Sequence, residues 1–505
     1  TAPGFGEKWS PAYLPFAIRD YNGREVYRGY SDAYGHYNGM AYSTFTANMP
    51  IPSGYSPAML ATCLNDLGDN PDPEEQRLQN YSNSCYTLQF MPGTTTYLDT
   101  PVLPTAAFAA GFYPADCAAP ARTPTIATVT GDANIGPLVA TEGTLTIASH
   151  GTVAIPNPAY GGPQDLANPE TIMRDLGFGG MAGTAMLDGE ALSINSWTDN
   201  EIVASLPAGI AEGSYQLVVT RDTGETSINA VTVTVGNETA VEVTQGESIQ
   251  AAIDSAPAGS LILIGPGTYN EQVVMYRPVR LQGAGADTII NALKVPTENL
   301  QDWIDLVSGL FNAGTVDPLP GQADLTLAAE LGAGVTVLAK NDGSFSSTPS
   351  RIDGFTITNA DVGGGIFVNG WAHGLQISNN NITANSGSRH GGIRLGHPGL
   401  PLEGGGPFGF NNDVAIHHNS ITSNGALSVQ ASGGGVSLSA GTDNYAVTEN
   451  FICGNYAAGD GAGIGHLGMS DNGLIQFNTI AFNQSFSLSF NQHGGGIAVS
   501  GEAAE

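Results

Sequence analysis

The last third of the chain, residues 351–505, repeats one arrangement of apolar and polar positions. An Asn is followed two residues later by an Ile and three residues after that by a second Asn. The first Asn recurs at intervals of 39, 31 and 28 residues, in the copies Asn380-Ile382-Asn385, Asn419-Ile421-Asn424, Asn450-Ile452-Asn455 and Asn478-Ile480-Asn483. Repeats of this length are typical of a solenoid, in which each copy forms one turn of the chain.

Each copy also carries the period-two alternation of a short strand. Apolar pairs precede the first Asn, at Leu375 and Ile377, Val414 and Ile416, and Tyr445 and Val447, and Gly-rich strand starts lie between the copies at 363–366, 391–393, 433–436, 461–464 and 494–497. Alternation of this kind places one set of side chains inward. Because a single turn cannot bury its own apolar face, stacking must supply the stability. The pattern predicts a right-handed parallel β-helix, so we expect an all-β protein.

The asparagines are expected to mark the corners of this β-helix. Asn tolerates a left-handed backbone, and its amide both donates and accepts hydrogen bonds. We therefore predict a buried ladder in which each amide bonds to the amide of the next turn, formed by Asn380, Asn419, Asn450 and Asn478.

The solenoid is expected to begin near residue 246. Residues 247–256 place Ile249, Ala252 and Ile253 at helical spacing, and short apolar strands follow at 261–264, 273–275 and 279–283. The whole segment, SIQAAIDSAPAGSLILIGPGTYNEQVVMYRPVRLQGAG, resembles the amino-terminal cap and first turns of pectinesterase- and NosD-type β-helices. This resemblance implies a β-helix over residues 246–505. Helical spacing at 299–310 and 323–331 predicts an insertion at about 293–332.

Residues 121–236 form a second unit with alternating strands at 144–147 and 215–219. The order of segments at 178–180, 185–189, 194–199 and 202–207 resembles an IPT/TIG domain, interrupted by an insertion at about 151–176. The resemblance implies an immunoglobulin-like β-sandwich. Trp197 then has two interpretations, a core residue of the sandwich or a platform that binds a carbohydrate.

Residues 1–120 are rich in Tyr, Pro and Gly, and a strand ending in an Asn-Gly turn is predicted at 17–23. The segment that follows, SDAYGHY, resembles the signature of carboxypeptidase-regulatory and Cna-B-like repeats, which implies a prealbumin-like β-sandwich module. Three of the four cysteines lie in this region, and Cys63–Cys85 is the expected disulfide. Cys453 aligns with Thr422 and Ala481, so we expect a small packed residue there.

The charge excludes some partners. The formal net charge is -31, from 15 basic and 46 acidic residues. Nucleic-acid binding needs basic patches, so we expect none. No segment is long and apolar enough to span a membrane. The chain starts at Thr1 and stops at Glu505 just after a strand, which favours a processed or truncated piece of a longer protein, or an end covered by a partner. We expect a secreted or cell-surface location.

Seven of the nine histidines lie in the predicted β-helix. Arg394 follows the inward Ile393 and His417 precedes its corner Asn by two, so both should face outward. In an enzyme, Arg389 or Arg394 would hold a sugar carboxylate and His390 or His417 would act as base, with His397 beside them. His418 and His466 fall in inward rows. The alternatives are structural histidines or a metal site; the cofactor stays unknown, with Ca²⁺ the candidate.

Two functions follow from these observations. The first is an extracellular structural or adhesive surface protein that assembles into a filament or layer, with copies of itself, other surface proteins and a polysaccharide as partners. Two sandwiches ahead of a solenoid would form a long rod. The second is a polysaccharide lyase or epimerase acting on an anionic glycan, which requires Arg394, His390 and His417 to converge in one outward groove.

Overall fold

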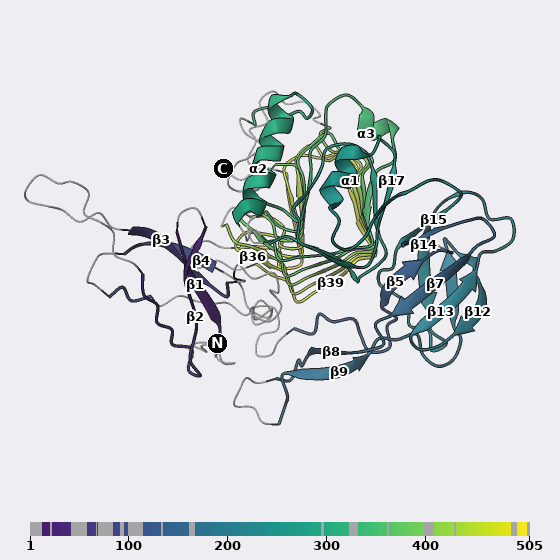
Figure 1. Ribbon diagram of the computed structural model, residues 1–505, viewed down its shortest axis with the longest axis horizontal. Helices are drawn as coiled ribbons and strands as arrows, with labels where there is room; N and C mark the ends of the chain where they lie inside the picture. Colours follow the sequence, from purple (N-terminus) through teal and green to yellow (C-terminus); the bar gives the residue numbers. More distant parts are fainter. Residues whose placement is uncertain are drawn as a thin grey trace, which may run out of the picture.

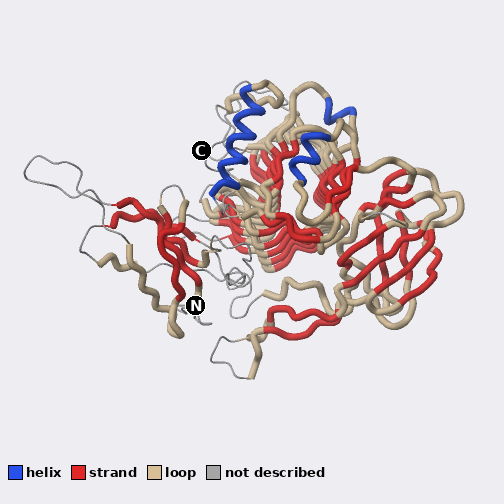
Figure 2. The backbone as a smooth tube through the Cα atoms, in the orientation of Figure 1, coloured by secondary structure: helices blue, strands red, loops and turns tan. Residues whose placement is uncertain are grey.

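The computed structural model describes residues 13–20, 23–41, 58–66, 68, 84–90, 95–98, 115–132, 135–160, 167–293, 297–322, 332–360, 363–397, 409–428, 431–485 and 492–501. A stack of parallel strands fills the centre of the molecule, and antiparallel units lie on two sides of it (Figure 1). Strands and loops dominate, with three helices in the described residues near one end of the stack (Figure 2). The expected all-β parallel β-helix is confirmed.

The β-helix is built from three parallel sheets, to which successive turns of the chain add one strand each. The first sheet contains β16(Val241–Val243), β17(Leu261–Ile264), β20(Arg280–Gly283), β23(Arg351–Asp353), β26(Gln376–Ser378), β30(Ala415–His417), β34(Ala446–Thr448) and β38(Leu474–Gln476). The second contains β18(Gly267–Tyr269), β21(Thr288–Asn291), β24(Thr356–Thr358), β27(Asn381–Thr383), β31(Ser420–Thr422), β35(Phe451–Cys453) and β39(Thr479–Ala481). The third contains β19(Val273–Met275), β22(Val335–Val337), β25(Ile366–Val368), β29(Ile393–Leu395), β33(Val436–Ser439), β37(Ile464–Leu467) and β41(Ile497–Ser500).

A short fourth sheet lines the corner between the second and third sheets. It contains β28(Ser386–Gly387), β32(Gly425–Ala426), β36(Tyr456–Ala457) and β40(Gln484–Ser485). Inward apolar residues from all three main sheets form one continuous core, with Ile377, Ile382 and Ile393 among its fully buried members. The period-two pattern of the sequence therefore corresponds to the inward rows of the stack.

Two asparagine ladders run along the corners on either side of the second sheet. The Asn380 amide donates to Asn419 at 3.1 Å, Asn419 donates to Asn450 at 2.9 Å, and Asn450 donates to Asn478 at 2.9 Å. Asn385, Asn424, Asn455 and Asn483 form the second ladder in the same way. The left-handed backbone that was expected at each ladder Asn is not found at the Asn itself.

The left-handed residue is the one before each ladder Asn. Its φ is 59° at Asn379, 53° at His418, 57° at Glu449 and 58° at Phe477. The corner turn is made one residue earlier, and the Asn that follows is free to aim its amide along the stack.

Three helices accompany the β-helix: α1(Ile249–Ser255), α2(Thr297–Asn312) and α3(Ser344–Ser347). Helix α1 starts at the N-cap Ser248 and buries Ile249, Ala252 and Ile253 over the first strands, as the helical spacing predicted. Helix α2 lies in the expected insertion and packs Trp303 and Val307 against the outer side of β19. The second predicted helical segment, 323–331, lies outside the described residues.

Residues 126–235 form a two-layered β-sandwich whose strands are antiparallel except for one parallel pair at the edge of one sheet. One sheet has the order β11(Glu190–Ala191), β10(Thr184–Leu187), β14(Gly213–Thr220), β15(Thr232–Val235) and β6(Leu138–Val139), and the other has β12(Ser193–Trp197), β13(Glu201–Ser205), β7(Thr144–Ser149) and β5(Ile126–Thr130). Buried residues such as Leu145, Ile202 and Leu217 fill the space between them. A separate hairpin, β8(Thr152–Pro156) and β9(Thr171–Asp175), occupies the region where an insertion was expected.

The amino-terminal unit is a four-stranded antiparallel sheet. Its order is β2(Glu25–Tyr30), β1(Pro15–Arg19), β3(Ala58–Leu64) and β4(Ser84–Phe90). The Cys63–Cys85 disulfide links the paired strands β3 and β4, which is the pairing that proximity in the sequence suggested. The sandwich and this sheet lie beside the β-helix on different sides (Figure 1). The end-to-end rod is therefore wrong, because the sandwich docks laterally on the first sheet.

Candidate functional site

Arg394 lies on β29 in the third sheet, and its environment differs from the expected one. Its neighbours Ile393 and Leu395 point into the core, so its side chain leaves the core as alternation requires. It is nevertheless fully buried, with the guanidinium 4.9 Å above the Phe367 ring and Nε donating to the Gly396 carbonyl at 2.8 Å. Arg394 therefore points away from the core as predicted, but the prediction that it is accessible is wrong.

His390 and His397 share this neighbourhood. The His390 ring is buried 6.2 Å from the Phe367 ring, and a Cβ on Gly364 would approach its Nε2 to 2.4 Å. Burial, followed by the charge of Arg394, lowers the pKa of His390 well below its usual value. Burial and the charges of Arg394 and Arg389 lower the pKa of His397 to about 3. The structure thus gathers the four residues predicted around one turn, as neutral histidines beside cations.

His417 lies on a different face of the β-helix. It belongs to β30 in the first sheet, paired with Ser378 and Thr448, whereas Arg394 and His390 lie at the third sheet. The expected row of His417 is correct, but the core of the β-helix separates it from Arg394. The three candidate catalytic residues therefore do not converge on one face, as the enzyme hypothesis required.

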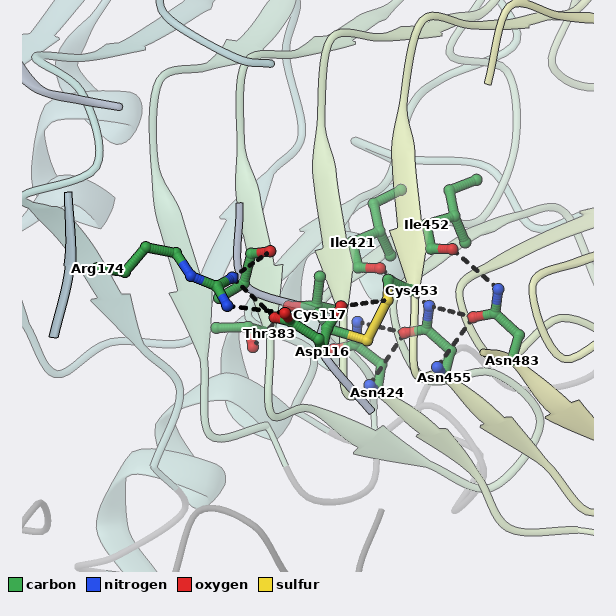
Figure 3. The surroundings of a disulfide bond; sticks show 12 residues. Asp116, Cys117, Arg174, Thr383, Ile421, Asn424, Ile452, Cys453, Asn455 and Asn483 are labelled. Atoms are coloured by element: carbon green, nitrogen blue, oxygen red, sulfur yellow. Dashed lines mark hydrogen bonds and ion pairs between the residues drawn. A yellow bond between two sulfur atoms is a disulfide. The ribbon is translucent and has the colours of Figure 1, made fainter. Parts of the chain in front are cut away.

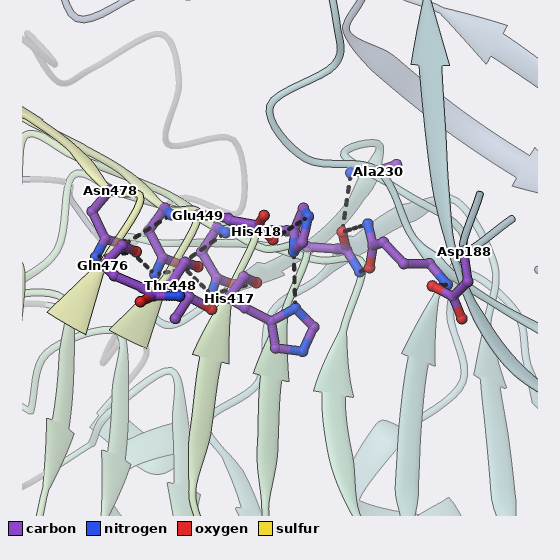
Figure 4. A network of polar contacts seen from close by, with 12 residues as sticks. Asp188, Ala230, His417, His418, Thr448, Glu449, Gln476 and Asn478 are labelled. Carbon is purple, nitrogen blue, oxygen red and sulfur yellow. Dashed lines mark hydrogen bonds and ion pairs between the residues drawn. The ribbon is translucent and has the colours of Figure 1, made fainter. Parts of the chain in front are cut away.

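A hydrogen-bonded relay connects His417 to a carboxylate (Figure 4). Nδ1 of His417 lies 3.0 Å from Nδ1 of His418, and Nε2 of His418 lies 3.0 Å from the Glu449 carboxylate. A proton on His418 Nε2 leaves its Nδ1 as acceptor, so His417 donates from Nδ1 and its Nε2 keeps the lone pair. Burial lowers the pKa of both rings, which favours these neutral tautomers.

Two histidines were expected in inward rows. His466 does point inward, opposite Leu438, and its Nδ1 lies 3.1 Å from the Tyr445 hydroxyl. His418 instead occupies a left-handed corner position and pairs with Glu449 at the surface, so its expected inward position is wrong. The prediction for His418 failed because the left-handed turn at this residue interrupts the alternation of inward and outward side chains.

The densest polar site joins the sandwich to the first sheet, and sequence reasoning missed it. The fully buried Asp353 carboxylate accepts hydrogen bonds from the Thr232 backbone at 2.7 Å and hydroxyl at 2.6 Å. Gln282, Ser378 and Asn379 donate to the same carboxylate at 2.8, 2.5 and 2.8 Å. Because a carboxylate can accept several such bonds, its buried charge is well satisfied.

Arg351 lies two residues before Asp353 on β23 and extends this contact between the sandwich and the first sheet, which we call the seam. Its guanidinium donates to Gln282, to Ser214 at 2.8 Å and to Thr234 at 2.7 Å, so it reaches two strands of the sandwich. Burial lowers the pKa of Arg351 to about 10, which leaves it charged at neutral pH. The sequence signal was the pair of charges flanking the inward Ile352, since buried outward rows seldom carry charges without a partner.

Trp197 packs against the sandwich core, 6.1 Å from the Phe178 ring, and its indole N–H donates to the Gly179 carbonyl at 3.1 Å. These contacts favour the core interpretation over a carbohydrate platform, because the ring packs against the core and its N–H already has a partner.

Cys453 is not the small packed residue that was expected. It does align with Thr422 and Ala481, but it forms a disulfide with Cys117, 336 residues earlier (Figure 3). Beside this bond, Arg174 of β9 holds the Asp116 carboxylate with two bonds of 2.8 and 2.7 Å. Aligning the repeats of the β-helix placed Cys453 in the correct row but could not show a disulfide partner 336 residues away.

Neither a cluster of metal ligands nor a membrane-spanning helix is found among the described residues. No three or more His, Cys, Asp or Glu side chains in this part of the chain gather in a way that would hold a metal ion. None of the described helices combines the length and apolar character needed to cross a bilayer.

No known family model matches this chain, and neither does any curated protein sequence. Among solved structures, a Family 28 exopolygalacturonase from Yersinia enterocolitica is similar, with 12% sequence identity and a TM-score of 0.21. The match covers 70% of this chain and 68% of the other. This similarity is too low for any conclusion about activity.

Proposed function

We propose that this chain is a structural or adhesive protein of the cell exterior. The observation that carries the proposal is the seam at Asp353 and Arg351, whose buried charges are used to fix the sandwich onto the β-helix. Both groups are buried and bond one unit of the chain to the other. A scaffold needs rigid internal joints of this kind.

The cysteines support the location. All four are in disulfides, and no free cysteine is present in the described chain. Disulfides persist in oxidising compartments and are rare in the cytosol. A secreted or surface location, for a protein that combines IPT/TIG-like and Cna-B-like modules with a β-helix, agrees with this chemistry. The partners in this proposal are copies of the chain or other surface proteins, with a polysaccharide as a further contact.

A polysaccharide lyase or epimerase is the second candidate, and one observation favours it. The relay from Glu449 through His418 leaves a lone pair on His417 Nε2, which is the arrangement a general base needs. Arg394 cannot hold the sugar carboxylate beside this base, because Arg394 lies in another sheet. An enzyme would therefore need a different cation near His417 to bind an anionic sugar.

Electron microscopy of native material tests the main proposal. Culture supernatant and isolated cell surfaces would be imaged with an antibody against this chain. Ordered filaments or layers containing the chain are the expected result. Dispersed monomers alone would contradict assembly, and the same material would then be assayed on uronate polysaccharides for unsaturated products, with His417→Gln as the inactive control.

A further inference from the structure

A short strap, residues 115–123, leads into the sandwich and contacts the second sheet on the way. In this strap the Cys117 sulfur is bonded to Cys453 on β35. The Asp116 carbonyl lies 3.9 Å from the Cys453 sulfur, and the Asp116 side chain is held by Arg174. The strap is thus fixed to the β-helix covalently and to the hairpin by an ion pair (Figure 3).

The neighbouring backbone is shaped for this bond. Gly454, which follows Cys453, has φ +66°, and a Cβ there would lie 2.7 Å from the Cys117 sulfur. Glycine adopts this left-handed conformation readily and, having no Cβ, leaves room for the sulfur. The corresponding corner residues in neighbouring turns are Ala384, Ser423 and Phe482, so a side chain is tolerated at this corner except where Cys117 lies.

The position of the bond in the topology has a mechanical consequence. Cys117 precedes the sandwich, and β35 is the sixth of the seven strands in the second sheet. Between the two cysteines lie the whole sandwich, helices α1 to α3 and most of the β-helix. Tension applied before Cys117 and after Cys453 therefore has a covalent path that avoids all of these elements.

We propose that the Cys117–Cys453 disulfide is a mechanical bypass, which carries tension past the sandwich and most of the turns of the β-helix. This inference rests on the proposed structural function and specifies the load that such a protein can bear. Adjacent turns of a solenoid contact only their neighbours, so a pull on the last turn would otherwise peel the stack one turn at a time. With the bypass, peeling stops at Cys453.

Single-molecule pulling of the full chain from both ends tests the bypass. An unfolded residue spans at most about 3.6 Å, so locking 336 residues hides roughly 1,100–1,200 Å of extension. The oxidised protein should therefore extend by that much less than the double variant Cys117→Ser, Cys453→Ser. The double variant Cys63→Ser, Cys85→Ser is the matched control, because it opens a loop of 22 residues and should add only roughly 70–80 Å.

Two results would overturn the bypass. One is equal extension of the oxidised protein and the Cys117→Ser, Cys453→Ser variant. The other is the absence of a linked peptide joining Cys117 and Cys453 in a non-reducing digest. If the variant fails to fold, wild-type protein pulled with and without reductant gives the comparison, with the roughly 70–80 Å of the Cys63–Cys85 loop added to the difference. If electron microscopy shows ordered assemblies but the oxidised protein extends fully, the bypass is rejected and the proposed function stands. If it shows only dispersed monomers but the oxidised protein extends less than the variant, the proposed function is rejected and the bypass stands.

Discussion

Thr232 of the sandwich donates two hydrogen bonds, from its backbone N–H and its hydroxyl, to the two oxygens of the Asp353 carboxylate on the β-helix. Both residues lie in strands, β15 and β23, so the contact joins two sheets directly rather than through a loop. The link between the units is therefore as rigid as the sheets that provide it.

Asp353→Asn should loosen this joint. The amide nitrogen that replaces one oxygen is a donor facing donors, so at least one of Thr232, Ser378 and Asn379 loses its acceptor in a buried site. We expect a loss of about 2–4 kcal/mol in the free energy of unfolding. Urea denaturation followed by circular dichroism measures it. Asp222→Asn, at an exposed turn, is the control, and equal midpoints for the two variants would contradict a structural role for Asp353.

The Asn ladder should be most sensitive in its middle. Asn419→Ala removes the acceptor for the Asn380 backbone and side chain and the donor for the Ile377 carbonyl, all of them buried. The expected cost is about 2–4 kcal/mol, because these groups are left without partners away from water.

Asn478→Ala is the matched control for the ladder. The same amide is removed from the last described position, which is half-buried, so water can replace its bonds. The loss should be nearer 1 kcal/mol by urea denaturation. A cost at Asn478 equal to that at Asn419 would show that burial along the ladder is not what sets its contribution.

The ladder could be predicted because every part of its chemistry is local. Each Asn sits at a fixed distance from an inward Ile, so one repeat specifies the corner and the row for all repeats. The row of His417 was predictable for the same reason. The direction of the Arg394 side chain, away from the core, was predictable because the adjacent Ile393 points inward.

What the sequence could not provide was the relation between rows. The strands before each Asn form the first sheet and the Gly-rich starts form the third, so His417 and Arg394 lie on different faces even though both point away from the core. Cys117 and Asp353 were missed because their partners come from another unit of the chain. Contacts between units follow no repeat, so no periodicity shows them.

Arg394→Ala distinguishes the two functions. We expect the substitution to lower stability by about 2–4 kcal/mol, because it leaves a buried space over Phe367 and frees the Gly396 carbonyl. Thermal denaturation checks the result, with the half-buried Arg389→Ala as the milder control. A fully stable Arg394→Ala that loses turnover on a uronate polysaccharide would instead support the enzyme.

Acid should destabilise the β-helix through its histidines. Burial is the first cause that lowers the pKa of six of them: His373, His390, His397, His417, His418 and His466. The unfolded chain then binds protons near pH 6.5, where the folded chain does not. Stability is complete above that value and is lost as the pH falls toward the lower folded values, with His397 the extreme case at about 3.

Urea denaturation at pH 8 and pH 5.5 measures this loss, and His390→Gln assigns part of it. The variant removes one buried proton-binding group, so the difference in free energy of unfolding between the two pH values should shrink by up to about 1.4 kcal/mol, the value of one pKa unit. Phe367→Leu is the matched control, because it disturbs packing in the same cluster without removing a proton site. It should lower stability equally at both pH values. If His390→Gln and Phe367→Leu behave alike, the acid sensitivity arises from groups other than His390.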